Sequence, residues 1–426
     1  AYSPVAAGQV GIGALISGHP LVGFSAIAAV MAATTALALP AIVILTVFPA
    51  TFGYWRVGPA SANLSLADVT LALGFIAALP YAPWRAPALR RMLRIAAVYA
   101  AMLSISVVFH PSQRATIEVL HRLFLVVCAV SVGAAVTNLG RIATSLRIFV
   151  AAAALVAGAA VVDALTHWPS HSQLPRPAYP WGIHKNAAGF LIACALVLLI
   201  VAQNELKVSR TLRAPILLLL FAGLIACQSR GSGVTLILVL LLWSFTSDRA
   251  RISPLTIAGA LVVVIVTVVS VNALFAADER ASQFNSLNSR ITTYDATMAL
   301  WKDSKLTGLG LKYWREPALA RSLAFGEPHN LVVSALGETG IIGLVALAYL
   351  VAATGKLARS RRETMATVAL LLIVAKAVDS MLGIFWVAGT LTLPFLIVGI
   401  ALGRQADRAA VDPRTTAPHA LANTQS

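Results

Sequence analysis

The chain has 426 residues, of which 59% are hydrophobic and only 11% are charged, and its mean hydropathy is +0.84. A soluble protein needs many more charged residues to cover its surface. The composition therefore excludes an ordinary soluble fold and indicates a protein embedded in a lipid bilayer. The net charge of +16 does not indicate a nucleic-acid partner, because the basic residues form short clusters between apolar runs rather than one basic domain.

Apolar segments of roughly 20 residues, the length that a membrane helix needs, recur along the chain. Because Pro40 interrupts the first long stretch and residues 8–18 could add a partial span, we expect about 12 to 14 transmembrane helices. The sequence therefore predicts an all-α, polytopic membrane helix bundle over residues 1–403, followed by a disordered cytoplasmic tail at 404–426. The segments lie at about 22–38, 40–55, 66–80, 94–109, 117–137, 143–165, 186–203, 212–227, 232–247, 254–275, 329–353, 365–385 and 387–403.

The loops between these segments alternate in charge from residue 66 onward. Basic loops face the cytoplasm in membrane proteins, so the alternation predicts a multi-pass protein of the cytoplasmic (inner) membrane whose other loops face outward. The basic loops are 85–94, 141–147, 207–213, 249–251, 356–362 and 404–408. The outward loops are then 56–65, 110–116, 166–185, 228–231, 276–328 and 384–388.

The outward loop at 276–328 is the longest and nearly balances its acidic and basic residues. Long loops without regular structure are unusual unless they are functional. Ile291, Tyr294, Met298 and Trp301 recur at helical spacing, which predicts an amphipathic helix lying over the membrane surface. A helix that only covers the bundle would show the same pattern.

Ionisable residues at the ends of membrane helices are candidate functional residues, because they are costly to keep there. Arg230 lies in the turn 228–233 at a helix N-terminus, where free N–H groups and an added cation favour an anion; the alternative is an arginine that only snorkels to the interface. His329 and Asn330 close the long loop, and His329 has the side chain of a general base near neutral pH. A histidine at a helix start can equally be a cap.

Three further groups carry charge at or inside the predicted spans. His184 and Lys185 begin an outward helix, where they are either functional or part of an interfacial belt. Glu338 lies about 13 Å along the helix that follows His329 and needs a partner at that depth, so we interpret it as a structural or network residue. Lys376 and Asp379, three residues apart, can neutralise each other, and a structural ion pair is favoured over a transport relay.

Several motifs are missing from the sequence. There is no GxxxxGK[ST] phosphate loop, no HExxH, no Cys/His cluster and no DxD-like acidic pair in a loop. The three cysteines have no CxxC spacing, and a structural zinc site needs about four close ligands. We therefore expect no metal and no cofactor.

Four stretches resemble, in order and spacing, motifs of the O-antigen ligase and polymerase superfamily, which includes O-antigen ligases, Wzy-type polymerases and ExoQ-like polymerases. Together they cover residues 180–345, whereas residues 1–175 resemble the family only in hydropathy. Lys305 stands where the family commonly has proline. The stretches are 184–189 (HKNAAG, like HKNxxG), 229–231 (SRG), Arg290 with Trp301 and 306–310 (LTGLG, like R…W…PLxGxG), and 329–343 (HN followed by ExGxxG).

The resemblance implies a GT-C-like membrane glycosyltransferase with its active face periplasmic or extracellular. Its donor would be a glycan on a polyprenyl (undecaprenyl) diphosphate, and its acceptor a lipid such as lipid A core or another glycan. In this family the loop histidine is implicated as the base and outward arginines as the diphosphate clamp, which corresponds here to His329, Arg230 and Arg290. His184, Lys185 and Asn330 belong to the same motifs and are further candidate substrate-binding residues. We expect a monomer.

Two questions stay open at the level of the sequence. A secondary transporter or flippase of a lipid-linked glycan would share the span count and the outward arginines, although no ladder of carboxylates runs through the spans. Within the enzyme class, a ligase and a polymerase differ only in their acceptor. The HKN run slightly favours an ExoQ-like polymerase.

Overall fold

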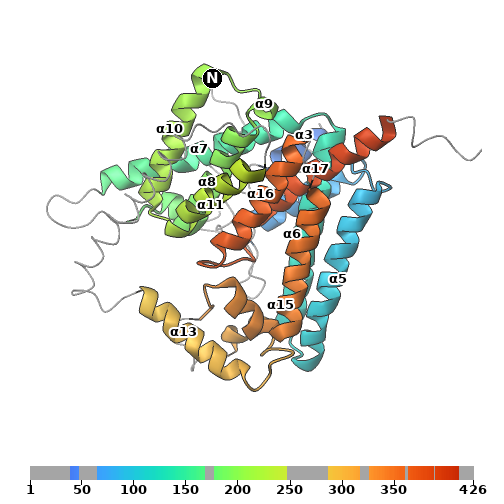
Figure 1. The fold of residues 1–426 in the computed structure, drawn as a ribbon, viewed down its shortest axis with the longest axis vertical. Helices are drawn as coiled ribbons and strands as arrows, with labels where there is room; N and C mark the ends of the chain where they lie inside the picture. Colours follow the sequence, from blue (N-terminus) through green and yellow to red (C-terminus); the bar gives the residue numbers. More distant parts are fainter. Residues whose placement is uncertain are drawn as a thin grey trace, which may run out of the picture.

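The computed structural model describes residues 39–47, 65–167, 177–246, 286–316, 326–359, 363–387 and 389–411. These ranges contain 13 α-helices, labelled in Figure 1, and two short 3-10 helices, η2 (Pro180–Gly182) and η3 (Tyr313–Arg315). The α-helices are α3 (Leu39–Leu45), α4 (Leu66–Ala78), α5 (Pro87–Phe109), α6 (Gln113–Asn138), α7 (Ile142–Thr166), α8 (Lys185–Val201), α9 (Gln203–Leu206), α10 (Arg210–Cys227), α11 (Arg230–Thr246), α13 (Ser286–Trp301), α15 (Leu331–Ala358), α16 (Thr364–Asp379) and α17 (Thr392–Val411).

The lengths and composition of these helices confirm the predicted polytopic membrane bundle. Five of them, α5, α6, α7, α10 and α15, are long and apolar enough to cross a membrane, and α4, α8, α11 and α17 contain shorter apolar stretches. The predicted spans at 22–38 and 254–275 lie outside the described residues, and only the first part of the span at 40–55 is described. The total number of spans therefore stays a prediction.

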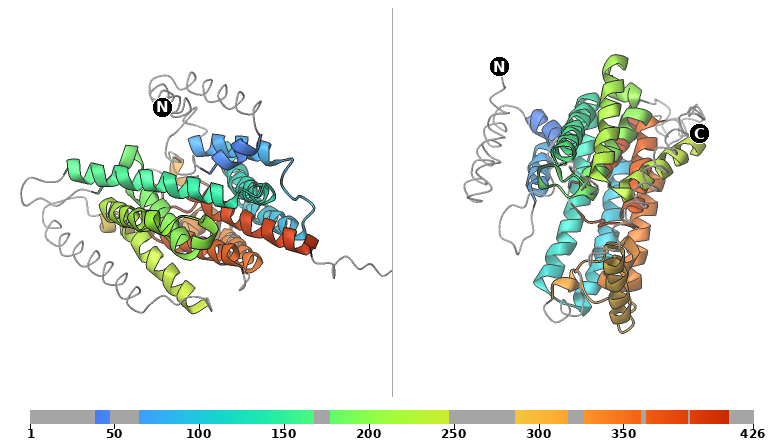
Figure 2. Two further views of the ribbon diagram at one scale, coloured as in Figure 1. Left: turned by 90° about the horizontal axis from the view of Figure 1, so that it is seen from above. Right: turned by 90° about the vertical axis from the view of Figure 1, so that its left-hand side faces the viewer.

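The helices form two groups (Figure 1). α5, α6, α15 and α17 run along one flank, and the right-hand view of Figure 2 shows that the long helices of this group are nearly parallel. α7, α8, α10 and α11 pack together as the second group, and α16 contacts α8 and α11 on one side and α15 and α17 on the other. α16 therefore joins the two groups.

α6 and α17 pack with their backbones in close contact. A Cβ atom at Gly399 would overlap the backbone carbonyl of Val130, and one at Gly133 would overlap that of Leu396. Gly399 and Gly403 form a GxxxG pattern, which lets membrane helices approach closely because no side chain separates them. The hydrophobic effect does not drive helices together in lipid, so the close van der Waals packing that these small residues allow stabilises the α6–α17 pair instead.

α17 continues to Val411, so residues 404–411 extend the last helix where the sequence predicted the start of a disordered tail. The residues in this segment are good helix formers apart from Asp407 and Val411. Arg404 also anchors the segment, because its guanidinium contacts Glu205 at 2.5 Å and Glu363 at 3.8 Å. Residues 412–426 lie outside the described residues.

The loops group as the charge alternation predicts. Arg114 donates to the carbonyl of Arg315 at 2.9 Å, so two loops predicted to face outward contact each other. Ala178 N–H of a third such loop donates to the carbonyl of Ala226, near the predicted outward end of α10, at 3.0 Å. Asn138 donates to the carbonyl of Tyr81 at 2.9 Å, and these two residues lie next to the predicted cytoplasmic loops 141–147 and 85–94. The assignment of the two ends to the two sides of the membrane stays a prediction.

α13 is a helix within the long outward loop, and it lies across one end of the bundle against α15 (Figure 1). Its buried positions are Thr293 and Thr297, whereas Ile291 from the predicted apolar stripe is 46% exposed. The helix packs on α15 through small β-branched residues because Thr297 meets the backbone at Gly337, where a Cβ atom would lie 2.8 Å from the threonine methyl group.

α15 is broken at Gly340, whose φ of 64° and ψ of −159° interrupt the helix. Free backbone groups are tolerated at membrane depth only where protein satisfies them. Here the LTGLG loop at 306–310 and the residue before it do so: Leu309 N–H donates to the Gly337 carbonyl at 2.8 Å, and Ile341 N–H donates to the Lys305 carbonyl at 2.9 Å. A side chain at Gly340 would overlap the backbone of Leu306. The two glycine motifs of the sequence therefore form one structural unit.

Candidate functional site

Five of the predicted site residues gather at one place, which we call the cationic site: His184, Lys185, Arg230, Arg290 and His329. They come from four elements, since His184 and Lys185 begin α8, Arg230 begins α11, Arg290 lies in α13 and His329 precedes α15. The charge of Arg290 acts on each of the other four side chains. Arg290 is therefore the common neighbour of residues that are up to 145 positions apart in the chain.

The start of α8 is held by the turn before it. Tyr179 N–H donates to Asp163 Oδ2 of α7 at 2.9 Å, and the Tyr179 ring meets the His184 ring edge-on with centroids 5.9 Å apart. Trp181 has the left-handed φ of 51°. His184 caps α8, because its Nδ1 accepts from Asn186 N–H at 3.3 Å. The ring nitrogen Nδ1 of His184 is thus occupied as an acceptor.

Two buried serines fix the turn that carries Arg230. Ser229 and Ser232 share a hydrogen bond at 2.8 Å, and the single proton of the Ser232 hydroxyl is shared between Asp379 Oδ1 of α16 at 3.1 Å and the Asn186 carbonyl at 3.4 Å. These bonds join α8, α11 and α16. Because both serines are buried while Arg230 is exposed, the turn presents the arginine at the surface of the bundle.

Asp379 and Lys376 make separate hydrogen bonds, which corrects the direct ion pair that their spacing favoured. Lys376 Nζ donates to the Ile384 carbonyl and to Thr390 Oγ1, each at 3.0 Å, and its ammonium lies over the Phe190 ring at 5.0 Å. The two charges still attract each other electrostatically. Lys376 and Asp379 do not pair directly because the loop after α16 provides acceptors for the ammonium and Ser232 provides a donor for the carboxylate.

His329 and Asn330 lie where the long loop meets α15. Tyr294 of α13 donates its hydroxyl to the His329 carbonyl at 3.0 Å. The Asn330 side chain caps α15, since its Oδ1 accepts from Val332 N–H at 2.9 Å and from Val333 N–H at 3.1 Å, and its Nδ2 donates to the Met381 carbonyl. The geometry thus gives Asn330 a structural task beside the site.

The electrostatics of the site follow from burial and from like charges. Burial, with the positive charge of Arg290 and a smaller effect of His184, lowers the pKa of His329 to about 4. Burial together with Lys185 and Arg290 also lowers the pKa of His184. Within the described ranges, neither Lys185 nor Arg290 has a carboxylate partner. Near neutral pH the site therefore combines a neutral His329, which can accept a proton, with cations that can take up an anion.

A second cluster, which we call the paired network, joins α6, α15 and the segment between α13 and α15. Arg122 of α6 contacts Glu338 Oε2 at 2.5 Å and Glu118 Oε1 at 2.9 Å. Lys312 contacts Glu118 at 3.4 Å and Glu327 at 3.8 Å. Arg122 also lies over the Trp386 ring at 5.0 Å. Glu338 thus has the buried partner that its depth requires, and each cation in this cluster faces at least one carboxylate.

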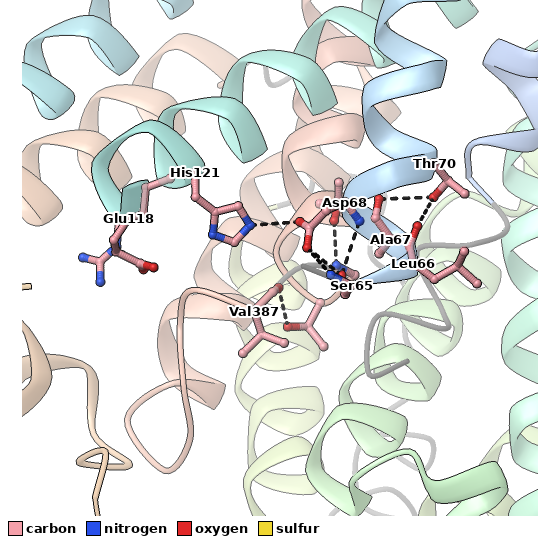
Figure 3. Close-up of polar contacts among 12 residues, drawn as sticks. Ser65, Leu66, Ala67, Asp68, Thr70, Glu118, His121 and Val387 are labelled. Carbon is pink, nitrogen blue, oxygen red and sulfur yellow. Dashed lines mark hydrogen bonds and ion pairs between the residues drawn. The ribbon is translucent and has the colours of Figure 1, made fainter. Parts of the chain in front are cut away.

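The paired network continues along α6 towards α4 (Figure 3). His121 Nε2 lies 2.9 Å from Asp68 Oδ1, and the other oxygen of Asp68 accepts from the Ser65 backbone N–H and hydroxyl. No motif in the sequence marks these residues or Lys312. Glu118 and Arg122 did carry a signal, because they stand four residues apart on a predicted membrane helix, the spacing of an intrahelical ion pair.

Comparison with known proteins agrees with the motifs. Residues 215–348 match the family model described as O-Antigen ligase, whereas none of the curated proteins compared gave a significant match. The matched segment runs from α10 to the middle of α15 and includes Arg230, Arg290, His329 and Glu338. Over residues 215–348, this match supports the resemblance to the O-antigen ligase and polymerase superfamily that the motifs indicate.

Proposed function

We propose that the chain is a membrane glycosyltransferase that moves a glycan from a polyprenyl (undecaprenyl) diphosphate donor to an acceptor hydroxyl on the outer face of the cytoplasmic membrane. The observation that carries this proposal is the cationic site, where a neutral histidine stands among cations. The family match supports an activity of the O-antigen ligase or polymerase kind. A lipid-linked donor suits a site at the end of a membrane bundle.

The cations would bind the diphosphate of the donor. Arg230 and Arg290 repel each other electrostatically, so an anion between them relieves repulsion as well as adding attraction. Guanidinium groups bind phosphate bidentately, and Lys185 adds a third charge. A diphosphate is a good leaving group that needs its developing charge stabilised more than it needs a proton. The transfer would then proceed without a metal ion.

His329 would act as the general base. It would take the proton from the acceptor hydroxyl while the new bond forms between that oxygen and the anomeric carbon. The bond from the anomeric carbon to the diphosphate oxygen breaks in the same step, and polyprenyl diphosphate leaves with the electron pair. Attack from the face opposite the leaving group inverts the anomeric centre.

Two kinds of acceptor fit this reaction. A ligase would use a hydroxyl on a lipid such as lipid A core, whereas a polymerase would use a second lipid-linked glycan. A transporter or flippase of the same lipid-linked glycan would also need the cations but would not need a base. The role of His329 therefore separates the enzyme from the transporter.

The test is glycan transfer by the purified chain in proteoliposomes with a lipid-linked repeat unit, in the presence of EDTA. We expect a new glycosidic bond, formed roughly 10² to 10⁴ times more slowly by His329→Ala. Arg230→Ala should also be severely impaired. His167→Ala and Arg114→Ala are matched controls, because these side chains are 49% and 51% exposed in loops of the same predicted face.

The products discriminate among the candidates. A ladder from one repeat unit alone identifies a polymerase, and product only after addition of an acceptor lipid identifies a ligase. If His329→Ala and Arg230→Ala insert normally and transfer glycan at the wild-type rate, the proposal is wrong. Movement of the donor across the bilayer without a new bond would favour the transporter.

A further inference from the structure

Lys312 lies at the centre of the paired network and has an unusual backbone. Its φ of 58° is left-handed, a conformation that a residue other than glycine rarely adopts, and its side chain is only 12% exposed. Such strain persists only where the surroundings enforce it. The enforcing contact is close by, since Lys312 N–H donates to Glu338 Oε1 at 3.2 Å.

The Lys312 side chain joins three segments of the chain. Its ammonium contacts Glu118 of α6 at 3.4 Å and Glu327 at 3.8 Å, and lies over the Trp314 ring at 5.1 Å. Burial alone would lower the pKa of Lys312, but Glu118, Glu327 and Glu338 together raise it above its usual value. The lysine is therefore charged throughout the physiological range and available as a permanent ion-pair partner.

Glu327 stands two residues before His329, with the buried Pro328 between them. Proline fixes its own φ and restricts the backbone of the residue before it. The Glu327–Pro328 link is therefore rigid, and a displacement of Glu327 would also displace His329. On its C-terminal side the segment is already bonded: Asn330 caps α15, and Leu331 N–H donates to the Ser380 carbonyl at 2.8 Å. Lys312 supplies the anchor on the N-terminal side.

We propose that Lys312 is a positioning residue for His329, which it acts on through the Glu327 carboxylate and the rigid Glu327–Pro328 link. This inference rests on the proposed role of His329 as the base. Lys312 would not touch the donor, because its partners belong to the paired network and not to the cationic site. The influences on the His329 pKa are burial, Arg290 and His184, so a change at Lys312 would reach His329 through its position.

The main experiment compares Lys312→Met, Lys312→Arg and Glu327→Gln in the proteoliposome assay. We expect kcat to fall at least roughly 10-fold in Lys312→Met and Glu327→Gln, because a displacement of about 1 Å can cost roughly 100-fold. The KM for the donor should change less than about twofold, since the diphosphate site is intact. Lys312→Arg keeps the charge and should recover most of the rate.

Glu205→Gln is the matched control. Glu205 and Arg404 form an ion pair at 2.5 Å with side chains 22% and 24% exposed, similar to Glu327 but among the loops predicted to be cytoplasmic. This variant should lose as much thermal stability as Glu327→Gln and keep its kcat. Equal losses of kcat in the two variants would show a general effect of destabilisation and would overturn the inference.

A second measurement does not need transfer activity. Carbethoxylation of His329 by diethyl pyrocarbonate, followed by peptide mass spectrometry across pH, reports the exposure and the pKa of this imidazole directly. If Lys312 positions His329, the modification rate should rise at least threefold in Lys312→Met and Glu327→Gln, because burial decreases. An unchanged profile in both folded variants overturns the inference.

The two readouts also separate this inference from the proposed function. If His329→Ala transfers glycan normally, the proposed base is wrong, whatever the modification profile shows. If His329→Ala is inactive but folded Glu327→Gln has wild-type kcat, the base stands and the positioning role of Lys312 is rejected. Should Lys312→Met fail to fold, Glu327→Gln and Lys312→Arg decide the question.

Discussion

The cationic site and the paired network each include a residue in or next to α15, and they use the same residue types in opposite ways. In the paired network, Arg122 and Lys312 are buried among Glu118, Glu327 and Glu338. In the cationic site, Lys185 and Arg290 have no carboxylate partner in the part of the chain that the structure describes. The paired network neutralises its cations, whereas Lys185 and Arg290 have no such carboxylate among the described residues.

This difference indicates what each cluster contributes. A buried charge is tolerated only when it is paired, and removing one partner is strongly destabilising because the other is left uncompensated. Like charges held close together lower the stability of the fold. Such a cluster is typical of a functional site, where a bound ligand of opposite charge offsets the repulsion. The paired network therefore supports the fold around α15, and the cationic site is suited to binding an anion.

The sharpest way to break the comparison is to make the same substitution in both clusters. Arg122→Met should lower the free energy of unfolding by about 3–5 kcal/mol, because Glu118 and Glu338 lose their partner. Arg290→Met should leave it unchanged or raise it slightly, since it removes repulsion. Unfolding in detergent, followed by tryptophan fluorescence, measures both. Equal destabilisation would contradict the distinction between paired and unpaired cations.

The next largest effect is on catalysis by the folded Arg290→Met protein. Transfer should fall roughly 100-fold, as expected when one donor to a developing charge is lost. Arg315→Met serves as the control, because Arg315 is an exposed arginine in the same outward loop. A rate within twofold of the wild type would remove Arg290 from the proposed diphosphate clamp.

The pH dependence of transfer tests the state of His329. A base must be unprotonated, so kcat/KM for the free enzyme should fall as the pH drops through the His329 pKa of about 4. Bound diphosphate offsets the charge of Arg290 and should raise this pKa, so the midpoint for kcat should lie at least about one unit higher. Coincident midpoints would show that the donor does not bind beside His329.

The smallest expected effect concerns Lys185. Inorganic pyrophosphate should inhibit transfer competitively, and Lys185→Met should weaken its binding roughly fivefold, the scale of a partly exposed charge contact. The inhibition should weaken with rising salt, because ions screen exposed charges. Inhibition that is independent of Lys185 and of salt would place the anion elsewhere.

Much of the fold could be predicted from the sequence. The apolar segments at 66–80 through 232–247 and at 329–403 correspond to helices, because a membrane helix satisfies its own backbone and needs only length and hydropathy. The break at Gly340 could not be predicted in this way, since the turn depends on LTGLG residues some 30 positions earlier that bond the freed backbone. The extension of α17 to Val411 likewise depends on a partner, Glu205, from another loop.

The residues of the candidate site could be predicted from the sequence, but their structural roles only in part. Arg230 and His329 could be found from the sequence because charged or titratable residues at helix starts are unusual in so apolar a chain. Arg290 was indicated only by the resemblance to the family motifs. The resemblance predicts that Asn330 binds substrate, which stays a prediction, and the structure adds that its side chain caps α15. Lys312 carried no local signal, because its partners Glu118 and Glu327 lie far away in sequence and its left-handed backbone cannot be seen in the residue type.

The sequence by itself determined that this protein lies in a membrane, that its architecture is all-α and which of its charged residues are unusual. Each of these properties depends on composition or on local periodicity. Tertiary structure alone decided which charges are paired. Arg122 and Arg290 are the same residue, and only packing places one between Glu118 and Glu338 and the other beside Arg230 and His329. Electrostatic energy depends on distance and burial in space, and neither is encoded by position along the chain.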